Sequence, residues 1–475
     1  MRVVHVASEV APFAQSGGLA DVVSGLPAAQ AETHGLEVGV IVPLYRGVAS
    51  RLADAGVVLD PGGPLALQVG VHSIKASLRI ARVGRVRYGF VDCAALYDRP
   101  GNLYGPGGAG EWHDNHVRFG ALGAAALAGA PALLGGSLDV LHCHDWQAGP
   151  AAIYARLATK PPAIVATIHN LAYRGIFPKT VMDELGLPWS TFNQHGIEFY
   201  DQVSFLKGAL AAADAVTTVS PSYAQEILTP QYGEALDGFL RWDVKRLLGI
   251  VNGIDTRSWD PKTDPALPAS FSRDDFANRA TCRSALAQEH GLPLGDDEPL
   301  IGAIARMTGQ KGLDLVAELA PELEKIGARM VVLGAGEHEL ETRFTYLAEK
   351  FSQHVAVRIG FDVSLARRIY GGSDLFVMPS RFEPCGLGQL YAMRYGSIPI
   401  VHAVGGLRDT VTDGSTGIQF HAPTVPALRA AIVRAVALFR DRARFTKLRR
   451  AALSRDSSWL ASALEYVQLY RSLRV

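Results

Sequence analysis

The second half of the chain alternates apolar segments of strand length with amphipathic helical segments, and few folds accept such a rhythm. The apolar segments lie at residues 300–305, 329–334, 355–361, 374–378 and 398–402. This alternation predicts a parallel, doubly wound α/β sheet. The first half carries similar apolar runs, at Val3–Ala7, Glu37–Tyr45 and Ala163–Thr167. The whole chain is therefore predicted to belong to the α/β class.

The length of the chain predicts more than one such domain. A single hydrophobic core stops growing beyond about 250–300 residues, and this chain has 475. We expect an N-terminal domain over 1–253, which ends in I-V-N-G-I-D, and a C-terminal domain over 254–456. The segment D-P-K-T-D-P-A-L-P, at 260–268, is rich in helix and strand breakers and is the natural place for the chain to cross.

Charge and cysteine content exclude several classes of partner. The 46 basic and 46 acidic residues give no electrostatic case for nucleic acid or an anionic membrane. Apolar runs are of about strand length and do not approach the roughly 20 residues of a membrane span, and the N-terminus reads as a strand and not as a signal peptide. The four cysteines contain no C-x-x-C pair, which favours reduced thiols in a cytoplasm.

The stretch from Asp374 to Gly396 predicts a strand, a tight loop and a helix start in close succession. It reads D-L-F-V-M-P-S-R-F-E-P-C-G-L-G-Q-L-Y-A-M-R-Y-G, with a strand over Leu375–Met378 and a helix over Gly386–Tyr395. A helix N-terminus suits a phosphate, and Glu383 lies in the loop just before it. Taken alone, Glu383 reads equally well as a solvated loop acid, and Cys385 as a small buried hydrophobe.

Two further glycine-containing turns have the character of anion sites. A-Q-S-G-G-L-A-D, at 14–21, places Gly17 and Gly18 at the start of a helix, although most such turns only redirect the chain. A-R-M-T-G-Q-K-G-L-D-L, at 305–315, places Arg306 and Lys311 around a turn after a strand. Two cations there can neutralise a diphosphate, or they can be ordinary surface charges.

Histidines mark the ends of two predicted strands. In D-V-L-H-C-H-D-W-Q-A-G, at 139–149, His142 and His144 share one face of a strand. No third ligand follows at helical or hairpin spacing, so we expect no metal. His169 follows the strand at 163–167, where ligands gather in open α/β sheets, although a structural histidine bonded to the backbone is the alternative. G-A-G-E after Leu333 lacks the third glycine of a dinucleotide fingerprint, so oxidoreductase chemistry is not favoured.

Taken together, the motifs resemble those of bacterial glycogen synthases and plant starch synthases. The resemblance is carried by five blocks in order between Val3 and Tyr470, above all S-R-F-E-P-C-G-L followed by Q-L-Y-A-M-R-Y-G. It implies the GT-B fold, with two Rossmann-like doubly wound domains facing across a deep cleft and a terminal helix, 457–475, packing back onto the first domain.

The resemblance also implies an activity. It is the retaining transfer of glucose from ADP-glucose to the non-reducing 4-hydroxyl of an α-1,4-glucan, in cytoplasmic glycogen biosynthesis, without a cofactor or metal. The motifs supply no carboxylate nucleophile opposite Glu383, which favours front-face attack assisted by the leaving phosphate.

Individual roles follow from the matching positions. The catalytic residues implied are Glu383, His169, Arg306, Lys311 and Asp21. The acceptor residues implied are Asp145 and Trp146. The donor residues implied are Gln15, Gly17, Gly18, Asn252, Arg306, Lys311, Phe361, Cys385, Gly386, Leu387 and Gly388.

Three positions depart from the family pattern. Gln15 stands where the family has the lysine of Lys-x-Gly-Gly-Leu, and the exchange removes a charge-assisted contact of about 1.5–3 kcal/mol. Phe361 replaces a tyrosine, and Gly388 replaces a hydroxyl residue. These departures keep three alternatives open: the same fold acting on UDP-glucose or another nucleotide sugar, a glucan-binding paralogue with low activity, and a sugar-nucleotide epimerase.

Overall fold

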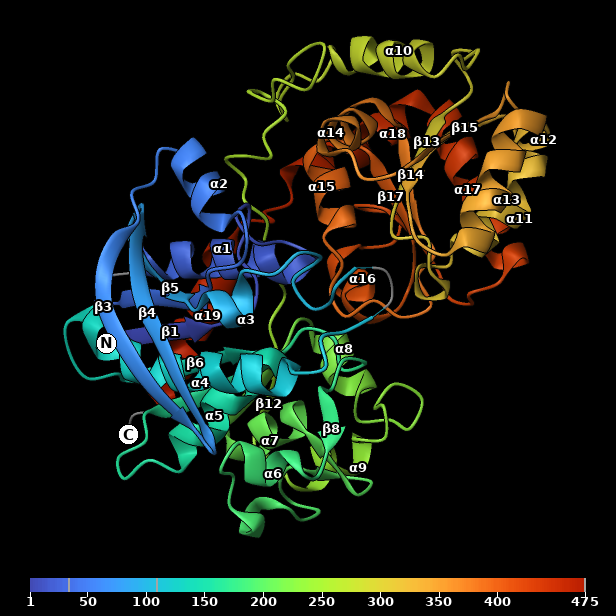
Figure 1. Cartoon of the computed structure of the whole chain (residues 1–475). Coiled ribbons are helices and arrows are strands. Elements are labelled where there is room, and N and C mark those ends of the chain that lie inside the picture. Colours follow the sequence, from blue (N-terminus) through green and yellow to red (C-terminus); the bar gives the residue numbers. More distant parts are fainter. Residues whose placement is uncertain (33–34, 108–109, 474–475) are drawn as a thin grey trace. The chain divides into compact units, whose positions relative to one another are not determined.

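The structure is a computed structural model that describes residues 1–32, 35–107 and 110–473 (Figure 1). The chain divides into two compact units. The first unit comprises Met1–Gly253 together with Trp459–Val475, and the second comprises Ile254–Ser458.

The first unit is built on a nine-stranded sheet in the order β12-β11-β7-β6-β1-β2-β5-β4-β3. The strands from β12 to β5 are parallel, and β3 and β4 add an antiparallel hairpin at one edge. The strands of this sheet are β1 (Arg2–Val6), β2 (Glu37–Pro43), β3 (Asp60–Val69), β4 (His72–Val83), β5 (Val86–Asp92), β6 (Val140–His144), β7 (Ala163–Ile168), β11 (Ala215–Thr218) and β12 (Leu247–Gly249). A small antiparallel sheet is made of β8 (Ile176–Pro178), β10 (Gln202–Ser204) and β9 (Glu198–Phe199).

The helices of the first unit cover this sheet and include its longest helix, α4. They are α1 (Gly18–Ala31), α2 (Val48–Asp54), α3 (Ala94–Tyr97), α4 (Asn115–Leu134), α5 (Gly149–Arg156), α6 (Val181–Glu184), α7 (Phe205–Ala212), α8 (Pro221–Glu226), α9 (Asp237–Trp242) and α19 (Trp459–Ser472), with 3₁₀ turns at Trp146–Ala148 and Trp189–Thr191.

Helix α4 corrects the expectation that no apolar segment approaches the length of a membrane span. Among the described residues it is the one helix with the length and composition of a membrane span, because His116 and Arg118 interrupt an otherwise apolar sequence only near its start. Most of the helix is buried against the sheet and α5, as in the core helices of many globular domains.

The C-terminal helix α19 packs within the first unit, where it lies beside α1 (Figure 1). Its side chains Trp459, Tyr466 and Tyr470 join a cluster with Leu26 of α1 and with the first residues of several strands. Gly25 permits this contact, since a Cβ there would lie 2.0 Å from Trp459 Nε1. The helix begins two residues later than the expected 457, and residues 474–475 lie outside the described residues.

The second unit contains a six-stranded, fully parallel sheet in the order β15-β14-β13-β16-β17-β18. Its strands are β13 (Leu300–Ile304), β14 (Arg329–Gly334), β15 (Val355–Ile359), β16 (Leu375–Met378), β17 (Ile398–His402) and β18 (Ile418–Phe420). The five strands predicted from apolar runs are thus confirmed, and the short β18 is additional. In chain order the arrangement is 3-2-1-4-5-6, which is the Rossmann order.

Helices cover both faces of this second sheet. They are α10 (Arg279–Glu289), α11 (Leu313–Leu319), α12 (Leu323–Ile326), α13 (His338–Lys350), α14 (Val363–Gly372), α15 (Gly388–Arg394), α16 (Gly405–Thr410), α17 (Val425–Arg440) and α18 (Arg442–Ser454), with 3₁₀ turns at Gly309–Lys311 and Ala320–Glu322.

The expected crossing segment at 260–268 proves to be part of the second unit, which corrects that expectation. The Asp264 side chain is fully buried, accepts from Arg367 at 2.8 Å and receives the hydroxyl of Tyr395. Leu267 enters the core of the same unit. A sequence rich in helix and strand breakers does not reveal that its polar side chains are buried and hydrogen-bonded. The chain passes between the two units at Gly253/Ile254 and again at Ser458/Trp459.

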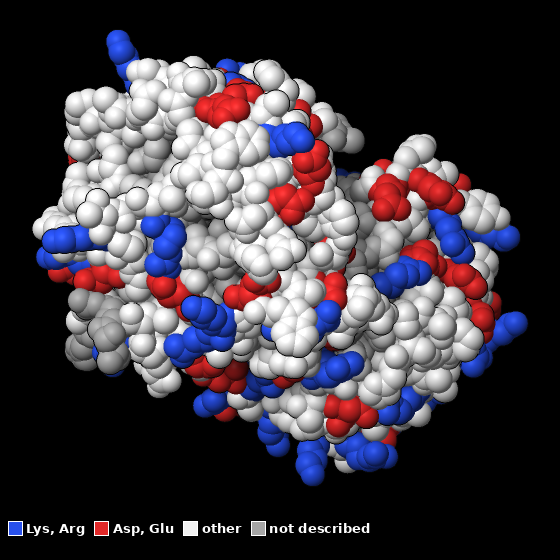
Figure 2. Space-filling model, turned by 90° about the horizontal axis from the view of Figure 1, so that it is seen from below, with Lys and Arg blue, Asp and Glu red and all other residues white. Residues whose placement is uncertain are grey.

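Surface charge agrees with the zero net charge of the sequence. On the face drawn in Figure 2, basic and acidic side chains are interspersed and neither sign forms an extended area. This face therefore lacks the concentrated positive potential that draws a protein to nucleic acid.

The strand orders also locate the position in each sheet where ligands are expected. In an open α/β sheet the crevice at the carboxyl ends opens where the strand order reverses. In the second unit the reversal lies between β13 and β16, and in the first between β1 and β6. The loops after these four strands contain most of the candidate site residues, whereas His169, Asn252 and Phe361 follow β7, β12 and β15.

Candidate active site

Glu383, in the loop after β16, is buried and ion-paired. Its side chain is 6% exposed, and its Oε2 accepts from Lys311 Nζ at 2.6 Å and from Ser380 Oγ at 2.9 Å. Lys311 belongs to the loop after β13, so the pair joins the two strands on either side of the reversal. Burial and pairing of this kind exclude the interpretation of Glu383 as a solvated loop acid.

The backbone of the Glu383 loop is held by a second glycine turn that the sequence analysis missed. Gly406, in α16, donates its N–H to the carbonyl of Glu383 at 3.0 Å. A Cβ on Gly406 would lie 2.3 Å from the carbonyl oxygen of Cys385, so only glycine permits this approach. The sequence feature that could have indicated this turn is the string V-G-G-L at 404–407. It follows a strand and contains two adjacent glycines, as does the turn at Gly17.

The loop after β13 is tied to the Glu383 loop by polar contacts. Arg381 forms a bidentate pair with Asp314 at 2.7 and 2.6 Å, and its backbone N–H donates to Gln310 O at 2.8 Å. Gly312 has a φ of +66°, and a Cβ there would lie 2.2 Å from the Pro379 carbonyl oxygen. These contacts fix Lys311 relative to Glu383.

Arg306 differs from Lys311 in its surroundings. It is exposed and has no ion-pair partner among the residues that the structure describes. Phe361, after β15, is 90% exposed, with its ring available to an aromatic partner. This edge of the second unit therefore offers one unpaired cation, one cation shared with a buried carboxylate, and one open aromatic face.

The helix expected over Gly386–Tyr395 is shorter in the structure. Helix α15 spans Gly388–Arg394, because Gly386 has a left-handed φ of +73° and Leu387 occupies the N-cap position. Cys385 is buried, in agreement with its reading as a small hydrophobe. The shortness of α15 leaves most of the positive charge at this edge to Arg306 and Lys311.

Gly388 is closely packed, and a larger side chain there would require its neighbours to shift by a few tenths of an ångström. A Cβ at this position would lie 3.2 Å from the sulfur of Met378 and 3.4 Å from the ring of Phe376. This packing gives a steric reason for glycine where the family pattern has a hydroxyl residue.

In the first unit, the Gly17 turn folds around a buried carboxylate, that of Glu9, which the sequence analysis did not single out. Glu9 follows β1 and accepts from Ser16 N at 2.7 Å, Ser16 Oγ at 2.5 Å and Gly17 N at 3.1 Å, as well as from the hydroxyl of Tyr104. A Cβ on Gly17 would meet nothing within 4 Å, so the outer side of the turn is open to a ligand. The sequence feature that could have indicated this site is Glu9 itself, an acidic residue in the loop that follows the first strand.

Gln15 and Asp21 lie together on the open side of this turn. Gln15 Nε2 donates to Asp21 Oδ2 at 3.2 Å, and Gly18 begins helix α1 beside them. Burial, reinforced by the negative charge of Glu9, raises the pKa of Asp21 to about 6. A neutral amide at position 15 leaves that pKa raised, whereas a cation would lower it.

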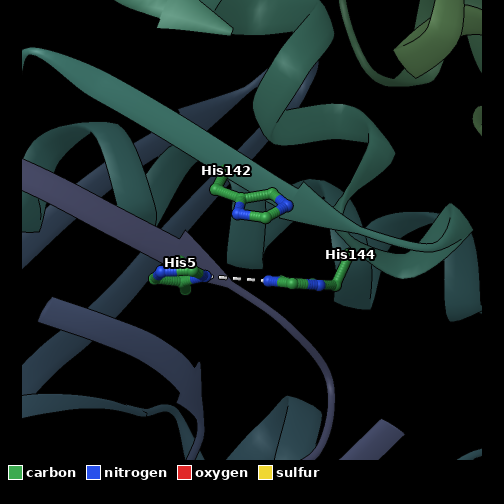
Figure 3. A group of neighbouring side chains, drawn as sticks. All are labelled: His5, His142 and His144. Carbon is green, nitrogen blue, oxygen red and sulfur yellow. Dashed lines mark hydrogen bonds between the residues drawn. The ribbon is translucent and has the colours of Figure 1, made fainter. Parts of the chain in front are cut away.

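Four histidines form a continuous cluster at the ends of β1, β6 and β7. Three of them, His5, His142 and His144, are fully buried (Figure 3). His5 Nδ1 lies 2.9 Å from His144 Nε2, and His144 Nδ1 lies 2.9 Å from His169 Nε2. Burial lowers the pKa of His5 to about 4 and that of His169 to about 3, and places the pKa values of His142 and His144 well below their usual range. All four rings are therefore neutral at pH 7.

The cluster corrects the expectation that His142 and His144 have no third companion. His5 comes from the neighbouring parallel strand (Figure 3). One ring nitrogen from each of His5, His142 and His144 lies within 4.8 Å of the other two, which is close enough to hold a metal ion. A ligand on a neighbouring parallel strand has no fixed sequence spacing, so helical and hairpin spacings do not find His5. Every ring nitrogen of the three already has a hydrogen-bond partner, however, with His142 bonded to Tyr470 Oη and Thr167 Oγ1. The group is built as a hydrogen-bonded network and not as an open coordination site.

The two expected acceptor residues have local structural roles. Asp145 adopts a φ of +56°, its Oδ1 accepts from His169 N at 2.8 Å, and burial raises its pKa to about 7. Trp146 is buried between the rings of Phe119 and Phe177, with centroids 5.0 and 5.8 Å away. Asp145 thus positions the backbone of His169, and the burial of Trp146 argues against its expected stacking on a sugar. Asn252 is also buried, just before the crossing point.

The predicted residues thus form two groups, one in each unit. The first unit brings together Gln15, Gly17, Gly18, Asp21, Asp145 and His169 around the β1–β6 reversal. The second brings together Arg306, Lys311, Glu383, Cys385, Gly386, Leu387 and Gly388 around the β13–β16 reversal, with Phe361 after β15.

Comparisons with known proteins agree with this division. The starch synthase catalytic domain matches residues 2–242, and the domain described as glycosyl transferases group 1 matches residues 287–451. Glycogen synthase of Anaeromyxobacter dehalogenans is 45% identical over 484 residues and covers 100% of both chains. Glycogen synthase of Myxococcus xanthus is 44% identical over 483 residues, covering 100% of this chain and 99% of the relative.

A solved structure gives the same result. The catalytic domain of starch synthase IV from Arabidopsis thaliana, bound to ADP and acarbose, superimposes with a TM-score of 0.88, at 32% identity and 99% coverage of each chain. The Rossmann-like units are those of a GT-B glycosyltransferase. The chain belongs to the glycogen and starch synthase family, and it is a hexosyltransferase of that family.

Proposed function

We propose that the protein is a glycogen synthase that transfers glucose from ADP-glucose to the non-reducing 4-hydroxyl of an α-1,4-glucan, with retention of configuration. The observation that carries the proposal is the buried Lys311–Glu383 ion pair at the strand-order reversal of the second unit, beside the unpaired Arg306. The full-length relatives named glycogen synthase support the substrate class. Four buried thiols support a reducing cytoplasm as its location.

The second unit supplies the donor side of this proposal. Arg306 and Lys311 carry the positive charge that a departing diphosphate requires as its bond to the sugar breaks. The 90% exposure of Phe361 supports a role for its ring in stacking on a nucleobase. The ADP in the Arabidopsis structure supports an adenine nucleotide as the leaving group.

The first unit supplies polar groups for the transferred sugar. His169 is neutral and partly exposed, which suits a hydrogen bond with a sugar hydroxyl. Asp21 supplies a carboxylate in this unit, and a carboxylate stabilises an oxocarbenium-like charge.

The mechanism that follows relies on the leaving group. Glu383 pairs with Lys311 and accepts from Ser380, which supports an electrostatic role for this carboxylate and not that of a free nucleophile. The departing phosphate then takes the proton from the attacking 4-hydroxyl on the same face, which preserves the configuration.

A glycogen-extension assay with ADP-glucose and UDP-glucose in parallel tests the proposal. We expect polymer growth and ADP release with ADP-glucose, and little growth with UDP-glucose. Growth only with UDP-glucose would identify the other donor, and binding of maltooligosaccharide without growth would identify a glucan-binding paralogue. Conversion of the nucleotide sugar without any acceptor would identify an epimerase, and each of these outcomes would overturn the proposal.

A further inference from the structure

A line of hydrogen bonds runs through the first unit from Gln30, on α1, to His169 at the end of β7. Gln30 Oε1 lies 2.7 Å from His5 Nε2, and the two His–His contacts at 2.9 Å continue the line through His144 to His169. Gln30, His5 and His144 are fully buried, whereas His169 is partly exposed. The line therefore connects a buried helix residue to the edge where substrate is expected.

The donor and acceptor roles along the line follow from its first contact. An amide oxygen only accepts, so the proton on His5 sits on Nε2. A neutral imidazole carries one proton, which leaves Nδ1 of His5 to accept from Nε2–H of His144. By the same rule Nδ1 of His144 accepts from Nε2–H of His169, and Nδ1 of His169 is left with a free lone pair.

Helix α19 holds Gln30 in the orientation that starts this order. Gln30 Nε2 donates to the hydroxyl oxygen of Tyr470 at 3.0 Å, and that hydroxyl in turn bonds to His142 Nδ1 at 2.6 Å. A branch then continues from His142 to Thr167 at 2.5 Å and from Thr167 to Thr217 at 2.6 Å. In this arrangement the Tyr470 hydroxyl accepts from the amide nitrogen and donates its own proton to His142, and the amide oxygen is the atom that faces His5.

We propose that Gln30 is a positioning residue that, through His5 and His144, fixes the tautomer of His169 so that its Nδ1 accepts a hydrogen bond from a hydroxyl of the transferred sugar. The proposal rests on the proposed function, since it takes the sugar to be the partner of His169. The line carries no net charge, because all its imidazoles are neutral at pH 7. The buried amide of Gln30 thus determines which ring nitrogen of His169 carries the proton, through three successive hydrogen bonds.

Nuclear magnetic resonance of the full chain labelled with [¹⁵N]histidine tests the tautomer directly, without substrate. The His169 signals are identified by their loss in His169→Asn. We expect an Nε2-protonated, Nδ1-unprotonated ring from pH 6 to pH 8. A ring protonated on Nδ1, a cationic ring, or a stoichiometric metal ion bound to His5 and His144 would overturn the proposal.

A pair of variants tests whether Gln30 acts on His169. Gln30→Met removes the acceptor for His5 and should give a mixture of His169 tautomers, with kcat/KM lower by about tenfold, the equivalent of one hydrogen bond. The matched control is Thr217→Val, which removes a buried hydroxyl from the branch but not from the line. It should keep the wild-type His169 signals and activity, and an equal loss in both variants would overturn the proposal.

The two readouts separate this proposal from the proposed function. The expected tautomer without polymer growth would remove the synthase activity and leave the hydrogen-bond line intact. Polymer growth with His169 in the other tautomer would do the opposite.

Discussion

The Lys311–Glu383 pair shows how a single buried contact can decide the character of a site. The Lys311 side chain is 19% exposed and pairs with a carboxylate that is 6% exposed. Removal of Glu383 therefore acts in two ways: it deletes a carboxylate from the site and leaves Lys311 free for a phosphate.

We expect Glu383→Ala to lower turnover on the order of 10²-fold or more, the usual cost of a lost electrostatic contact in a transition state. Binding of ADP should stay the same or tighten, because Lys311 and Arg306 remain. Steady-state kinetics and isothermal titration with ADP measure the two effects. Glu337→Gln is the control, since Glu337 is an exposed acid at the same edge that accepts from Gly309 N. Unchanged turnover in Glu383→Ala would remove this residue from the mechanism.

Position 15 permits a test of the other unit. Gln15 lies 3.2 Å from Asp21, so a lysine placed there can pair with that carboxylate and adds a cation to the open side of the Gly17 turn. We expect Gln15→Lys to lower the KM for ADP-glucose severalfold.

The same substitution has a signature in pH. The added cation lowers the pKa of Asp21 from its value of about 6, so an acid limb in kcat/KM that arises from Asp21 should move to lower pH. Gln15→Met, of similar length and without charge, serves as the control. If lysine and methionine behave alike, the first unit makes no phosphate contact at this position.

At the scale of elements, the docking of α19 on α1 holds the terminal helix in the first unit and supplies Tyr470 to the histidine network. It depends on the absence of a side chain at Gly25, where a Cβ would lie 2.0 Å from the indole nitrogen of Trp459. A bulky ring cannot yield as the tip of a flexible side chain does.

We expect Gly25→Ala to lower the free energy of unfolding by about 1–3 kcal/mol through overpacking, despite the better helix propensity of alanine. Gly238→Ala in α9 is the matched control, because a Cβ there meets nothing within 4 Å. That variant should be neutral, or more stable by up to about 1 kcal/mol. Urea unfolding measures both, and equal stabilities would mean that α19 shifts without cost.

Local sequence predicted most elements, and the errors share a cause. Five of the six strands of the second sheet were predicted because an apolar run bounded by breakers needs no partner to be recognised. Helix α15 was predicted too long because its sequence does not show the left-handed turn at Gly386, in a loop that packs against Gly406, 20 positions further along the chain. The segment 260–268 was taken as a crossing because the burial of Asp264 depends on Arg367, which lies 103 residues away.

For the whole molecule, the buried histidines couple folding to pH. His5, His142 and His144 have lowered pKa values, to about 4 for His5, whereas histidines of an unfolded chain titrate near 6.5. As pH falls through 6.5 the unfolded state binds protons that the native state does not. The stability present at neutral pH is therefore lost as pH falls, by about 1 kcal/mol for each of these histidines near pH 5.5.

Two carboxyl groups have the opposite effect on the free energy of unfolding and increase it as pH falls. Asp21 and Asp145, with pKa values raised to about 6 and about 7, bind protons in the native state as pH falls and offset part of the loss. We expect the free energy of unfolding to be lower at pH 5.5 than at pH 7 in urea titrations. His142→Asn should reduce the difference in free energy of unfolding between pH 7 and pH 5.5 by the contribution of one histidine, about 1 kcal/mol. This expectation holds whatever the substitution does to stability at pH 7. A larger stability at pH 5.5, or an unchanged difference in the variant, would contradict this assignment.

The sequence by itself determined the class of fold, the family and the residues at the ends of the critical strands, since these depend on local patterns of apolar residues, glycines and charges. Only the tertiary structure decided what those residues do to one another. The ion pair of Lys311 with Glu383, the enclosure of Trp146, and the joining of His5 to His144 all unite segments 27 to 139 residues apart. Partners on parallel strands have no fixed spacing along a chain, because the crossover between them can have any length, and so a linear reading identifies the groups but not their contacts.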